Sequence, residues 1–541
     1  MSENEARGRR RVISGLIRPM SEKYESYLCD ESRVIGNAES ISFPRTEVEL
    51  RYALSVEYAR GDRVTVQGGR TGISAGAVPN GGHIINLSRM DRITGMRKDA
   101  DGEFCVRVQA GVVLTRFNDA VAEKKFDASG WGYASLSALE DFHGAGPYMF
   151  MPDPTEDTAT IGGMAACNAS GALTYRYGST RRHISALRVM LCDGRSVSLR
   201  RGECFAKGRR LQLRTDDGDV LCLDLPTYTM PDVKNAAGYF VCDGMDAIDL
   251  FIGSDGALGV IFEVEVRLMK RPAHIWSAMC FFGGENDALR FVAECRDMVE
   301  NLAAIEYFDG ASLDILRGEK AFGASLTRIP DISARYGAAV CVELHGALES
   351  EAMEQLFYVG ECIDRAGGDI YDTWLARTSS ANIGLREMRR AIPERVNRLI
   401  ARRKLTEPTI SKLGSDMAVP DGFLRATLGM YRLGMTEAGL ESAVWGHIGN
   451  NHLHVNILPR SKEEFERGKA LIAEWAKRVS ESGGTISAEH GVGKLKRDAL
   501  RIMYGDKHIL EMSALKRALD PKWLLGCGNI LPAATFGARG V

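Results

Sequence analysis

The chain has 541 residues, with 69 Lys and Arg against 71 Asp and Glu, which gives a formal net charge of −2. At roughly 100–200 residues per domain this length predicts two to four domains, and 45% apolar with 26% charged residues is typical of a globular protein. The balanced charge argues against a protein that coats nucleic acid, and twelve cysteines without a C-x-x-C pair argue against a zinc ribbon or a protein-bound iron–sulfur cluster.

The chain begins with a basic segment that contains Arg7 and Arg9–Arg11. The apolar run that follows, residues 12–17, is too short for the core of a signal peptide, and no run approaches the ~18 apolar residues of a membrane-spanning helix. We expect residues 1–34 to form a solvated arm, with contact to an acidic partner or a membrane surface as the alternative. Free thiols fit a reducing compartment, so the predicted location is the cytoplasm, or the periphery of a membrane.

The next part of the chain alternates short β-rich runs with glycine clusters and contains few long helices. Val260–Leu268 alternates so that its apolar residues share one face, which predicts a strand with one buried side. Leu114, Phe117 and Val121 predict a short helix. Further strands are expected at residues 64–66, 84–87, 104–108 and 187–191, and the glycine clusters lie at residues 68–76, 159–171 and 253–259.

After residue 272 the pattern changes to helices alternating with strands, which predicts a mixed α+β second domain. A strand is expected at residues 338–344, and a helix at residues 464–482 is ended by two glycines. Eight of the 21 residues from Leu385 to Leu405 are Arg or Lys, which we interpret as a solvated helix face. Other apolar residues at helical spacing are Leu289, Val292, Cys295, Met298, Val299 and Leu302, and then Met353, Leu356, Phe357 and Ile363.

The glycine clusters indicate where the backbone approaches a ligand. Several glycines in one loop let backbone N–H groups converge on an anion, because no Cβ blocks the approach. Residues 68–76 follow a strand, as a pyrophosphate-binding loop does, but they do not match the G-x-G-x-x-G pattern of a Rossmann domain. Each cluster alone also fits a generic turn, so their joint occurrence is what favours a dinucleotide site.

Four of the ten histidines fall in two glycine-flanked segments near the C-terminal end, at residues 447–454 and at His490. If the chain bends at Gly449–Asn451, His447 and His454 point into one cavity from either side of the bend. Imidazole together with carboxylate suits Zn²⁺, Mn²⁺ or Fe²⁺. The alternative is a set of hydrogen-bonded histidines in a buried hairpin.

Several segments recur in the order of one known family. They are V-T-V-Q-G-G-R-T-G-I-S-A-G-A-V-P from Val64, P-D-P from Pro152, A-T-I-G-G from Ala159, N-A-S-G from Asn168, Y-R-Y-G from Tyr175 and F-I-G-S-D-G-A-L-G from Phe251. Over residues 35–531 the chain resembles FAD-linked oxidases of the vanillyl-alcohol-oxidase/p-cresol-methylhydroxylase fold. Within that fold it resembles the group of D-lactate dehydrogenase, glycolate oxidase and D-2-hydroxyglutarate dehydrogenase.

The resemblance implies an α+β fold. A two-subdomain FAD-binding module would occupy residues 35–272, an α+β cap domain residues 273–500, and residues 501–541 would return to the flavin. The implied FAD contacts are Gly68, Gly69, Arg70, Thr71, Gly72, Ser74, Pro152, Asp153, Thr160, Gly162, Gly163, Asn168, Ser170, Tyr177, Gly178, Gly259, Val260 and Ile261.

Two features of the first loop bear on how FAD is held. Arg70 stands where relatives usually have Gly, and its guanidinium either contacts the pyrophosphate or faces solvent. Some members bond FAD covalently through a His in this loop. No His lies between Gly68 and Pro79, so we expect non-covalent FAD.

The resemblance also implies the residues of the chemistry. Metal-dependent members have G-H-x-G-D-G-N-L-H and G-E-H-G segments. By this likeness His490 is the catalytic base, and Arg386 and Lys412 are candidates for the substrate carboxylate, each with a solvent-exposed alternative. The implied metal ligands are His447, His454 and Glu489.

This chain departs from those motifs at several positions. Asn450, Asn451 and His452 replace the usual Asp, Gly and Asn. On an extended strand His452 and His454 share a face, so His452 either adds to the site or perturbs it. Cys527 is expected to be a small packed residue, with a reactive thiol near the flavin as the alternative.

The resemblance therefore predicts FAD-dependent oxidation of a D-lactate-like D-2-hydroxy acid to the 2-oxo acid. Hydride would pass to flavin N5, with a divalent cation as Lewis acid and His490 taking the hydroxyl proton. The alternatives are a non-redox transferase resembling alkyl-dihydroxyacetone-phosphate synthase and an FAD-bearing electron-transfer subunit. Electrons are expected to leave to O₂, a quinone, an electron-transferring flavoprotein or an iron–sulfur subunit.

Overall fold

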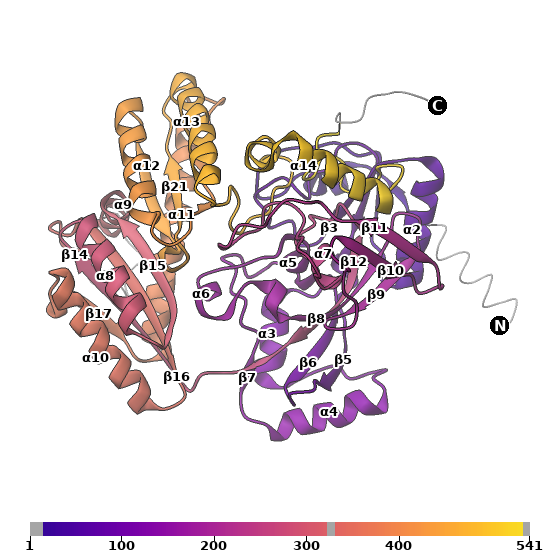
Figure 1. The fold of residues 1–541 in the computed structure, drawn as a ribbon, viewed down its shortest axis with the longest axis horizontal. Coiled ribbons are helices and arrows are strands. Elements are labelled where there is room, and N and C mark those ends of the chain that lie inside the picture. Colours follow the sequence, from indigo (N-terminus) through magenta and orange to yellow (C-terminus); the bar gives the residue numbers. More distant parts are fainter. Residues whose placement is uncertain (1–14, 322–330, 534–541) are drawn as a thin grey trace, which may run out of the picture.

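The computed structural model describes residues 15–321 and 331–533, which form two lobes (Figure 1). The N-terminal lobe comprises residues 15–270, and residues 497–533 return to pack against it. The cap lobe comprises residues 274–482. The α+β class predicted from the sequence is confirmed.

A four-stranded sheet, in the order β1-β2-β4-β3, begins the N-terminal lobe. Strands β2 and β3 both pair in parallel with β4, and α2 connects them. Leu50, Ala53 and Leu54 lie on one face of α2 at helical spacing and are buried against the sheet. The elements are β1 (Arg18–Pro19), β2 (Ser40–Ser42), α2 (Glu47–Arg60), β3 (Val64–Gln67) and β4 (His83–Asn86).

A five-stranded antiparallel sheet, in the order β5-β6-β12-β8-β9, forms the rest of this lobe's centre. The predicted strand at Val260–Leu268 is its central strand, and the predicted apolar face is buried. The opposite face is partly buried: Ile261 and Glu265 are buried, and Arg97 and Arg200 hold the Glu265 carboxylate, whereas Glu263 and Arg267 are partly exposed. The strands are β5 (Ile93–Lys98), β6 (Phe104–Gln109), β8 (Ile184–Met190), β9 (Ser196–Arg200) and β12 (Val260–Arg267).

Short helices pack beside this sheet, apart from α6, which contacts the cap strand Leu302–Asp309. The stripe of Leu114, Phe117 and Val121 is buried on α3. In α5 the Thr160 side chain accepts a hydrogen bond from Gly163 N at 3.2 Å and so caps the helix. The helices are α3 (Leu114–Glu123), α4 (Tyr133–Gly144), α5 (Ile161–Cys167), α6 (Thr174–Tyr177) and α7 (Ile248–Phe251).

The cap lobe contains an eight-stranded sheet, in the order β17-β14-β16-β15-β20-β21-β18 with β19 beside β21. Alternate residues of β14 enter two different cores: Cys280 and Phe282 pack on the side of α8 (Glu285–Met298), and Met279 and Phe281 on the side of α11 (Ser379–Arg403). The sheet is therefore covered on both faces. Its strands are β14 (His274–Phe282), β15 (Leu302–Asp309), β16 (Ala338–Gly346), β17 (Thr373–Ala376), β18 (Leu413–Gly414), β19 (Met417–Ala418), β20 (Ser442–Gly446) and β21 (His452–Ile457).

The cap helices differ from the predicted ones in two details. The predicted helix extends to Leu302, but α8 ends at Met298 and Leu302 begins β15. The prediction was too long because the buried residues Val299 and Leu302 continue the helical spacing beyond the end of the helix. In α10 the residues Met353 and Phe357 are 47% and 65% exposed, since smaller residues of that helix face the core. The helices are α8 (Glu285–Met298), α9 (Gly310–Ala321), α10 (Glu349–Ala366), α11 (Ser379–Arg403), α12 (Leu424–Ala438) and α13 (Lys462–Glu481).

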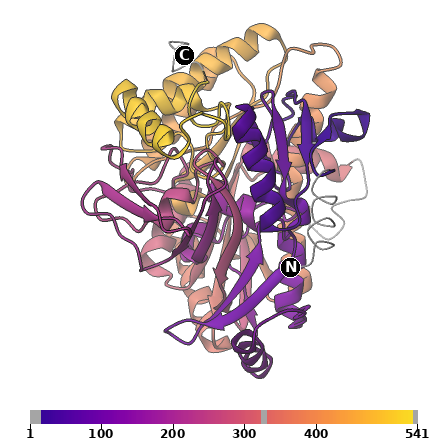
Figure 2. The ribbon, with the colours of Figure 1, turned by 90° about the vertical axis from the view of Figure 1, so that its right-hand side faces the viewer.

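The C-terminal segment returns to the N-terminal lobe through α14 (Arg497–Leu519). Beyond the helix, Leu525 pairs with Val64 at the edge of β3, and Val64 N donates to Leu524 O at 2.7 Å. Figure 2 shows the yellow C-terminal segment beside the indigo strands. The tail thus reaches the strand that leads into the first glycine cluster.

The predicted N-terminal arm is described only in part, because Arg7 and Arg9–Arg11 lie outside the described residues. In its described part, the short helix η1 (Glu22–Leu28) buries Tyr24, whose ring centroid lies 5.9 Å from that of Phe43. Within residues 15–321 and 331–533, no helix is long and apolar enough to cross a membrane.

Candidate active site

A hairpin in the cap lobe carries three of the histidines. Strands β20 and β21 are joined by a short 3-10 turn, Ile448–Asn450, and by Asn451 in the left-handed conformation at φ 51°. A Cβ at Gly446 (φ 139°) would lie 3.1 Å from the His452 carbonyl oxygen and from His454 Cδ2, so this position requires glycine. The predicted bend is confirmed.

Three imidazoles and one carboxylate converge at this hairpin. His447, His452, His454 and Glu489 each place one potential ligand atom in a group whose members lie within 4.8 Å of one another. Glu489 comes from the loop between α13 and α14, and its two oxygens lie 3.2 Å from His447 Nε2 and 3.0 Å from His454 Nε2. Nitrogen and carboxylate donors in this arrangement suit Zn²⁺, Mn²⁺ or Fe²⁺.

A second carboxylate orients His447. Glu306, buried on β15, lies 2.7 Å from His447 Nδ1 and 3.4 Å from the Arg389 guanidinium. Burial opposes the charged imidazole, but Glu306 raises the pKa of His447 to about 9. Burial likewise opposes ionisation of Glu306, yet His447 and Arg389 lower its pKa to about 2. This contact leaves Nε2 directed at Glu489, which is the role of outer carboxylates at metal-binding histidines.

A buried ammonium shares the Glu489 carboxylate. Lys234 Nζ lies 2.6 Å from Glu489 Oε2, and the lysine side chain is only 2% exposed. Burial opposes ionisation of Glu489, but Lys234 and His447 hold the pKa of this carboxyl well below its usual range. Glu489 is therefore a carboxylate, the form that binds a cation.

His490 differs from the other histidines because its side chain is 30% exposed. Its Nδ1 lies 3.2 Å from Asp416 Oδ2, and its Nε2 lies 3.4 Å from Glu489 Oε1. Burial opposes ionisation of Asp416, but His490 and Lys496 hold its pKa well below the usual range. An accessible imidazole with a carboxylate behind it is the arrangement of a general base.

The fold brings the first two glycine clusters together beside this group. A Cβ on Gly68 would lie 2.3 Å from Thr160 Oγ1, and a Cβ on Gly69 would lie 3.0 Å from the Thr158 carbonyl oxygen. Among the described residues, the backbone N–H groups of residues 69–75 donate no hydrogen bond to the protein. Successive N–H groups free of protein partners form an anion cradle, which fits the pyrophosphate of a dinucleotide.

The cradle adjoins the catalytic segment. Ser74 Oγ donates to the His490 carbonyl oxygen at 3.2 Å, and Lys494 N donates to the Ser74 carbonyl oxygen at 2.9 Å. Asp255, in the third glycine cluster, accepts from Val492 N at 3.1 Å. The dinucleotide loop and the His/Glu group therefore share one wall.

Other residues predicted to contact FAD lie around these loops. Ser170 Oγ is 3.5 Å from Glu489 Oε2, and Tyr177 OH is 2.7 Å from His345 Nδ1. Pro152, Gly162, Gly163, Asn168, Gly178, Gly259, Val260 and Ile261 lie in or beside α5, α6 and the start of β12. Burial raises the pKa of Asp153, which accepts from Leu173 N, to about 7.

The remaining predicted residues are more dispersed. The Arg70 guanidinium lies over the Tyr27 ring, 4.2 Å from its centroid. Arg386 is exposed on α11, and Lys412 is partly buried just before β18. Cys527 is buried and 3.9 Å from Asn80 Nδ2, consistent with a packed residue.

Sequence reasoning missed Glu306, Asp416, Lys234 and Arg389 as parts of the site. Glu306 interrupts a run that is otherwise apolar from Leu302 to Phe308, and a carboxylate inside such a run is the signal that could have found it. Arg389 lies in the arginine-rich helix that the sequence assigns to solvent, yet it pairs with Glu306.

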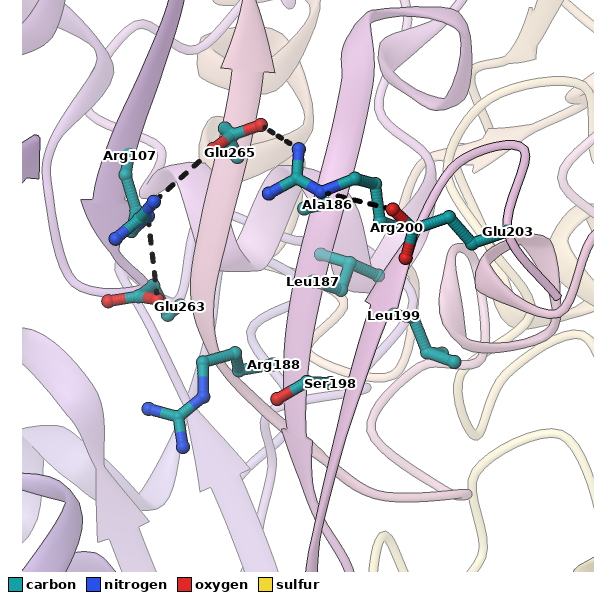
Figure 3. Close-up of a pocket in the computed structure, with 10 residues that line it drawn as sticks. All are labelled: Arg107, Ala186, Leu187, Arg188, Ser198, Leu199, Arg200, Glu203, Glu263 and Glu265. Carbon is teal, nitrogen blue, oxygen red and sulfur yellow. Dashed lines mark hydrogen bonds and ion pairs between the residues drawn. The ribbon is translucent and has the colours of Figure 1, made fainter. Parts of the chain in front are cut away.

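A pocket on the five-stranded sheet is separate from this site. Arg107 lies 3.9 Å from Glu263 and 3.7 Å from Glu265, and Arg200 lies 2.8 Å from Glu265. Figure 3 draws these contacts as dashed lines. None of the ten residues that line it is a predicted site residue. Because these charges pair with one another, the pocket adds nothing to the chemistry.

Two family models match the chain. "FAD binding domain" matches residues 38–132 and 134–200, and "FAD linked oxidases, C-terminal domain" matches residues 271–530. Among solved structures, p-cresol methylhydroxylase covers 97% of this chain and 96% of its own, with a TM-score of 0.64 and 14% identity. An alkyldihydroxyacetonephosphate synthase reaches a TM-score of 0.61 at 12% identity, covering 96% and 84%. These two likenesses show the fold.

Curated relatives match over nearly the whole length. The D-lactate dehydrogenase of Anaerostipes hadrus is 26% identical over 94% of this chain and 92% of its own. The D-2-hydroxyglutarate dehydrogenase of Stutzerimonas stutzeri is 26% identical over 91% of each. The glycolate oxidase subunit GlcD of Bacillus subtilis is 24% identical over 91% of this chain and 88% of its own.

Proposed function

Because this chain belongs to the FAD-linked oxidases related to D-lactate dehydrogenase, D-2-hydroxyglutarate dehydrogenase and glycolate oxidase, we propose that it oxidises a D-lactate-like D-2-hydroxy acid to the 2-oxo acid. The observation that carries the proposal is the convergence of imidazoles and a carboxylate beside the glycine cradle. A non-redox transferase has no evident use for such a group.

The proposal gives each part of the site a role. The glycine loops hold FAD non-covalently, and His447, His454 and Glu489 hold the cation. When bound, FAD supplies a hydride acceptor and the cation supplies Lewis-acid stabilisation of the developing alkoxide. Glu306 accepts the proton of His447 Nδ1 at 2.7 Å and directs Nε2 at the cation site, where cation binding would displace the Nε2 proton of the imidazolium.

His490 takes the hydroxyl proton in this proposal. Asp416 holds the Nδ1 proton of the imidazole, which leaves Nε2 to accept the proton on the side that faces Glu489. The 30% exposure of His490 gives substrate access to it. Arg386 and Lys412 remain the proposed partners of the substrate carboxylate, and a separate acceptor, a flavoprotein, an iron–sulfur subunit or a quinone, is proposed to reoxidise the enzyme.

Anaerobic reduction of the bound flavin tests this function. The purified protein is mixed with D-lactate, L-lactate, glycolate or D-2-hydroxyglutarate, and the yellow absorbance of oxidised flavin is followed. We expect bleaching with a D-enantiomer and none with L-lactate. A fully flavin- and metal-loaded protein that no 2-hydroxy acid bleaches would contradict the proposal. His490→Gln should retain flavin but bleach at least about a hundredfold more slowly.

A further inference from the structure

His452 is a fully buried histidine whose ring Nδ1 has no hydrogen-bond partner among the described residues. Its side chain is 0% exposed. The other ring nitrogen, Nε2, lies 2.9 Å from the carboxylate oxygen Asp416 Oδ1, so Nδ1 is the nitrogen left without a close partner. An unpartnered buried polar group destabilises a protein by about 1–3 kcal/mol unless something binds it.

The ring stands within the group that the proposed cation would occupy. Nδ1 is 4.0 Å from Glu489 Oε2, and the ring centroid is 4.4 Å from that of His454 and 5.5 Å from that of His447. His452 and His454 are two positions apart on β21, with Leu453 between them, so the two imidazoles lie on the same face of the strand. The strand therefore presents two imidazoles to one point.

We propose that His452 is a fourth protein ligand of the cation, so that the centre is held by three imidazoles and one carboxylate. The inference rests on the proposed function, and it deepens it. Asp416, 2.9 Å from the other ring nitrogen, would then be the outer carboxylate of this ligand. The same carboxyl group faces His490 through Oδ2, so one residue positions a metal ligand and the base.

The fourth ligand restricts which cation can serve. Zn²⁺ in proteins is usually four-coordinate, and its catalytic sites keep one position open for substrate. Four protein ligands would fill that tetrahedron. If a 2-hydroxy acid chelated the cation through two oxygens, the centre would need six positions, which would suit Mn²⁺ or Fe²⁺ better than Zn²⁺. The proposed cation is accordingly a six-coordinate one.

Metal binding to the full-length, flavin-loaded protein tests the inference without using turnover. Wild type, His452→Asn, His452→Gln and His454→Asn are stripped with a chelator and titrated with Mn²⁺, and the free aqueous ion is measured by electron paramagnetic resonance. His83→Asn is the matched control, because His83 is equally buried but lies in the four-stranded sheet, bonded to Ser40 and Ser42 at 2.8 Å. Flavin content and melting temperature report folding.

We expect both His452 variants to bind Mn²⁺ at least about tenfold more weakly than wild type, with His83→Asn unchanged. Co²⁺ in the wild type should show the weak visible bands of a six-coordinate ion. If His454→Asn weakens binding and both His452 variants do not, His452 is no ligand, and the proposed function stands. If wild type binds no Mn²⁺ yet its flavin is bleached by a 2-hydroxy acid, the proposed metal site and the role of His452 are both refuted, while the oxidation of a 2-hydroxy acid stands.

Discussion

Glu306→Gln tests whether the carboxylate behind His447 supports the metal centre. The variant keeps the shape of the side chain and its carbonyl can still accept from His447 Nδ1, but the charge is lost. Losing an outer-shell partner typically weakens metal binding about 10- to 100-fold, which corresponds to about 1.4–2.7 kcal/mol. The 2.7 Å contact and the near-complete burial of Glu306 favour the upper half of that range.

The same substitution should also lower stability when no metal is bound. Glu306 contacts the Arg389 guanidinium at 3.4 Å; Glu306 is buried and Arg389 is 23% exposed, so the loss of this pair should cost no more than the about 3–5 kcal/mol of a fully buried one. Asp153 and Glu343 also stabilise the charge of Arg389, so we expect the lower end. Chelator-competition titrations give the affinity, and urea unfolding of the stripped protein gives the stability.

Glu343→Gln is the matched control for this experiment. Glu343 lies on the neighbouring strand β16 and contacts His345 Nε2 at 2.8 Å, which reproduces the buried Glu–His contact outside the ligand group. This control should lose stability but keep its metal affinity. Equal metal affinity in Glu306→Gln and wild type would refute the role given to Glu306, whatever happens to stability.

Three further substitutions test other parts of the structure. Gly68→Ala places a Cβ 2.3 Å from the side chain of Thr160, the residue that caps α5. The variant should be less stable by about 1–3 kcal/mol and should show a lower flavin-to-protein absorbance ratio. Gly146→Ala is the control, because its Cβ would have no atom within 4 Å, and it should change neither quantity. Lys234→Met removes the ammonium that shares the Glu489 carboxylate, and isothermal titration should show divalent-metal affinity rising at least about tenfold; unchanged affinity would contradict this. Burial raises the pKa of Glu57 from 4.5 to about 7, so the folded state holds a proton that the unfolded state releases, and stability falls by about 2–3 kcal/mol as pH rises from 4.5 through 7. Glu57→Gln should flatten that fall in melting temperature, and an unchanged pH profile would count against the buried carboxyl as its source.

The hairpin of the candidate site could be predicted because its signals are local. Residues Gly449–Asn451 mark the bend, and the alternation of His452 and His454 follows from the period of a strand. The glycine loops could be predicted as a group: at Gly68 and Gly69 a Cβ would lie 2.3 and 3.0 Å from the second loop, although at Gly72 nothing lies within 4 Å.

The outer partners could not be predicted, because they depend on strand order. Glu306 meets His447, 141 positions further along the chain, only because β15 pairs with β20, and local patterns contain no information on that pairing. Arg389 illustrates the same limit. Its helix is rich in arginine and reads as a solvated face, but one position of that face points at a buried carboxylate.

The loop that carries the carboxylate ligand and the proposed base is anchored from both lobes. On the cap side Asp416 accepts from Ser487 Oγ at 2.9 Å, and on the N-terminal side Asp255 accepts from Gly493 N at 2.8 Å while Ser74 accepts from Lys494 N at 2.9 Å. Neither lobe alone therefore fixes the reacting groups. A shift of one lobe against the other moves the base relative to the cradle, and misplacement by about 1 Å can slow a reaction about a hundredfold. The geometry of the site is thus a property of the lobe interface. The glycine cradle and the His/Glu group can each be predicted from sequence, but the distance between them cannot, because it depends on how the two lobes pack.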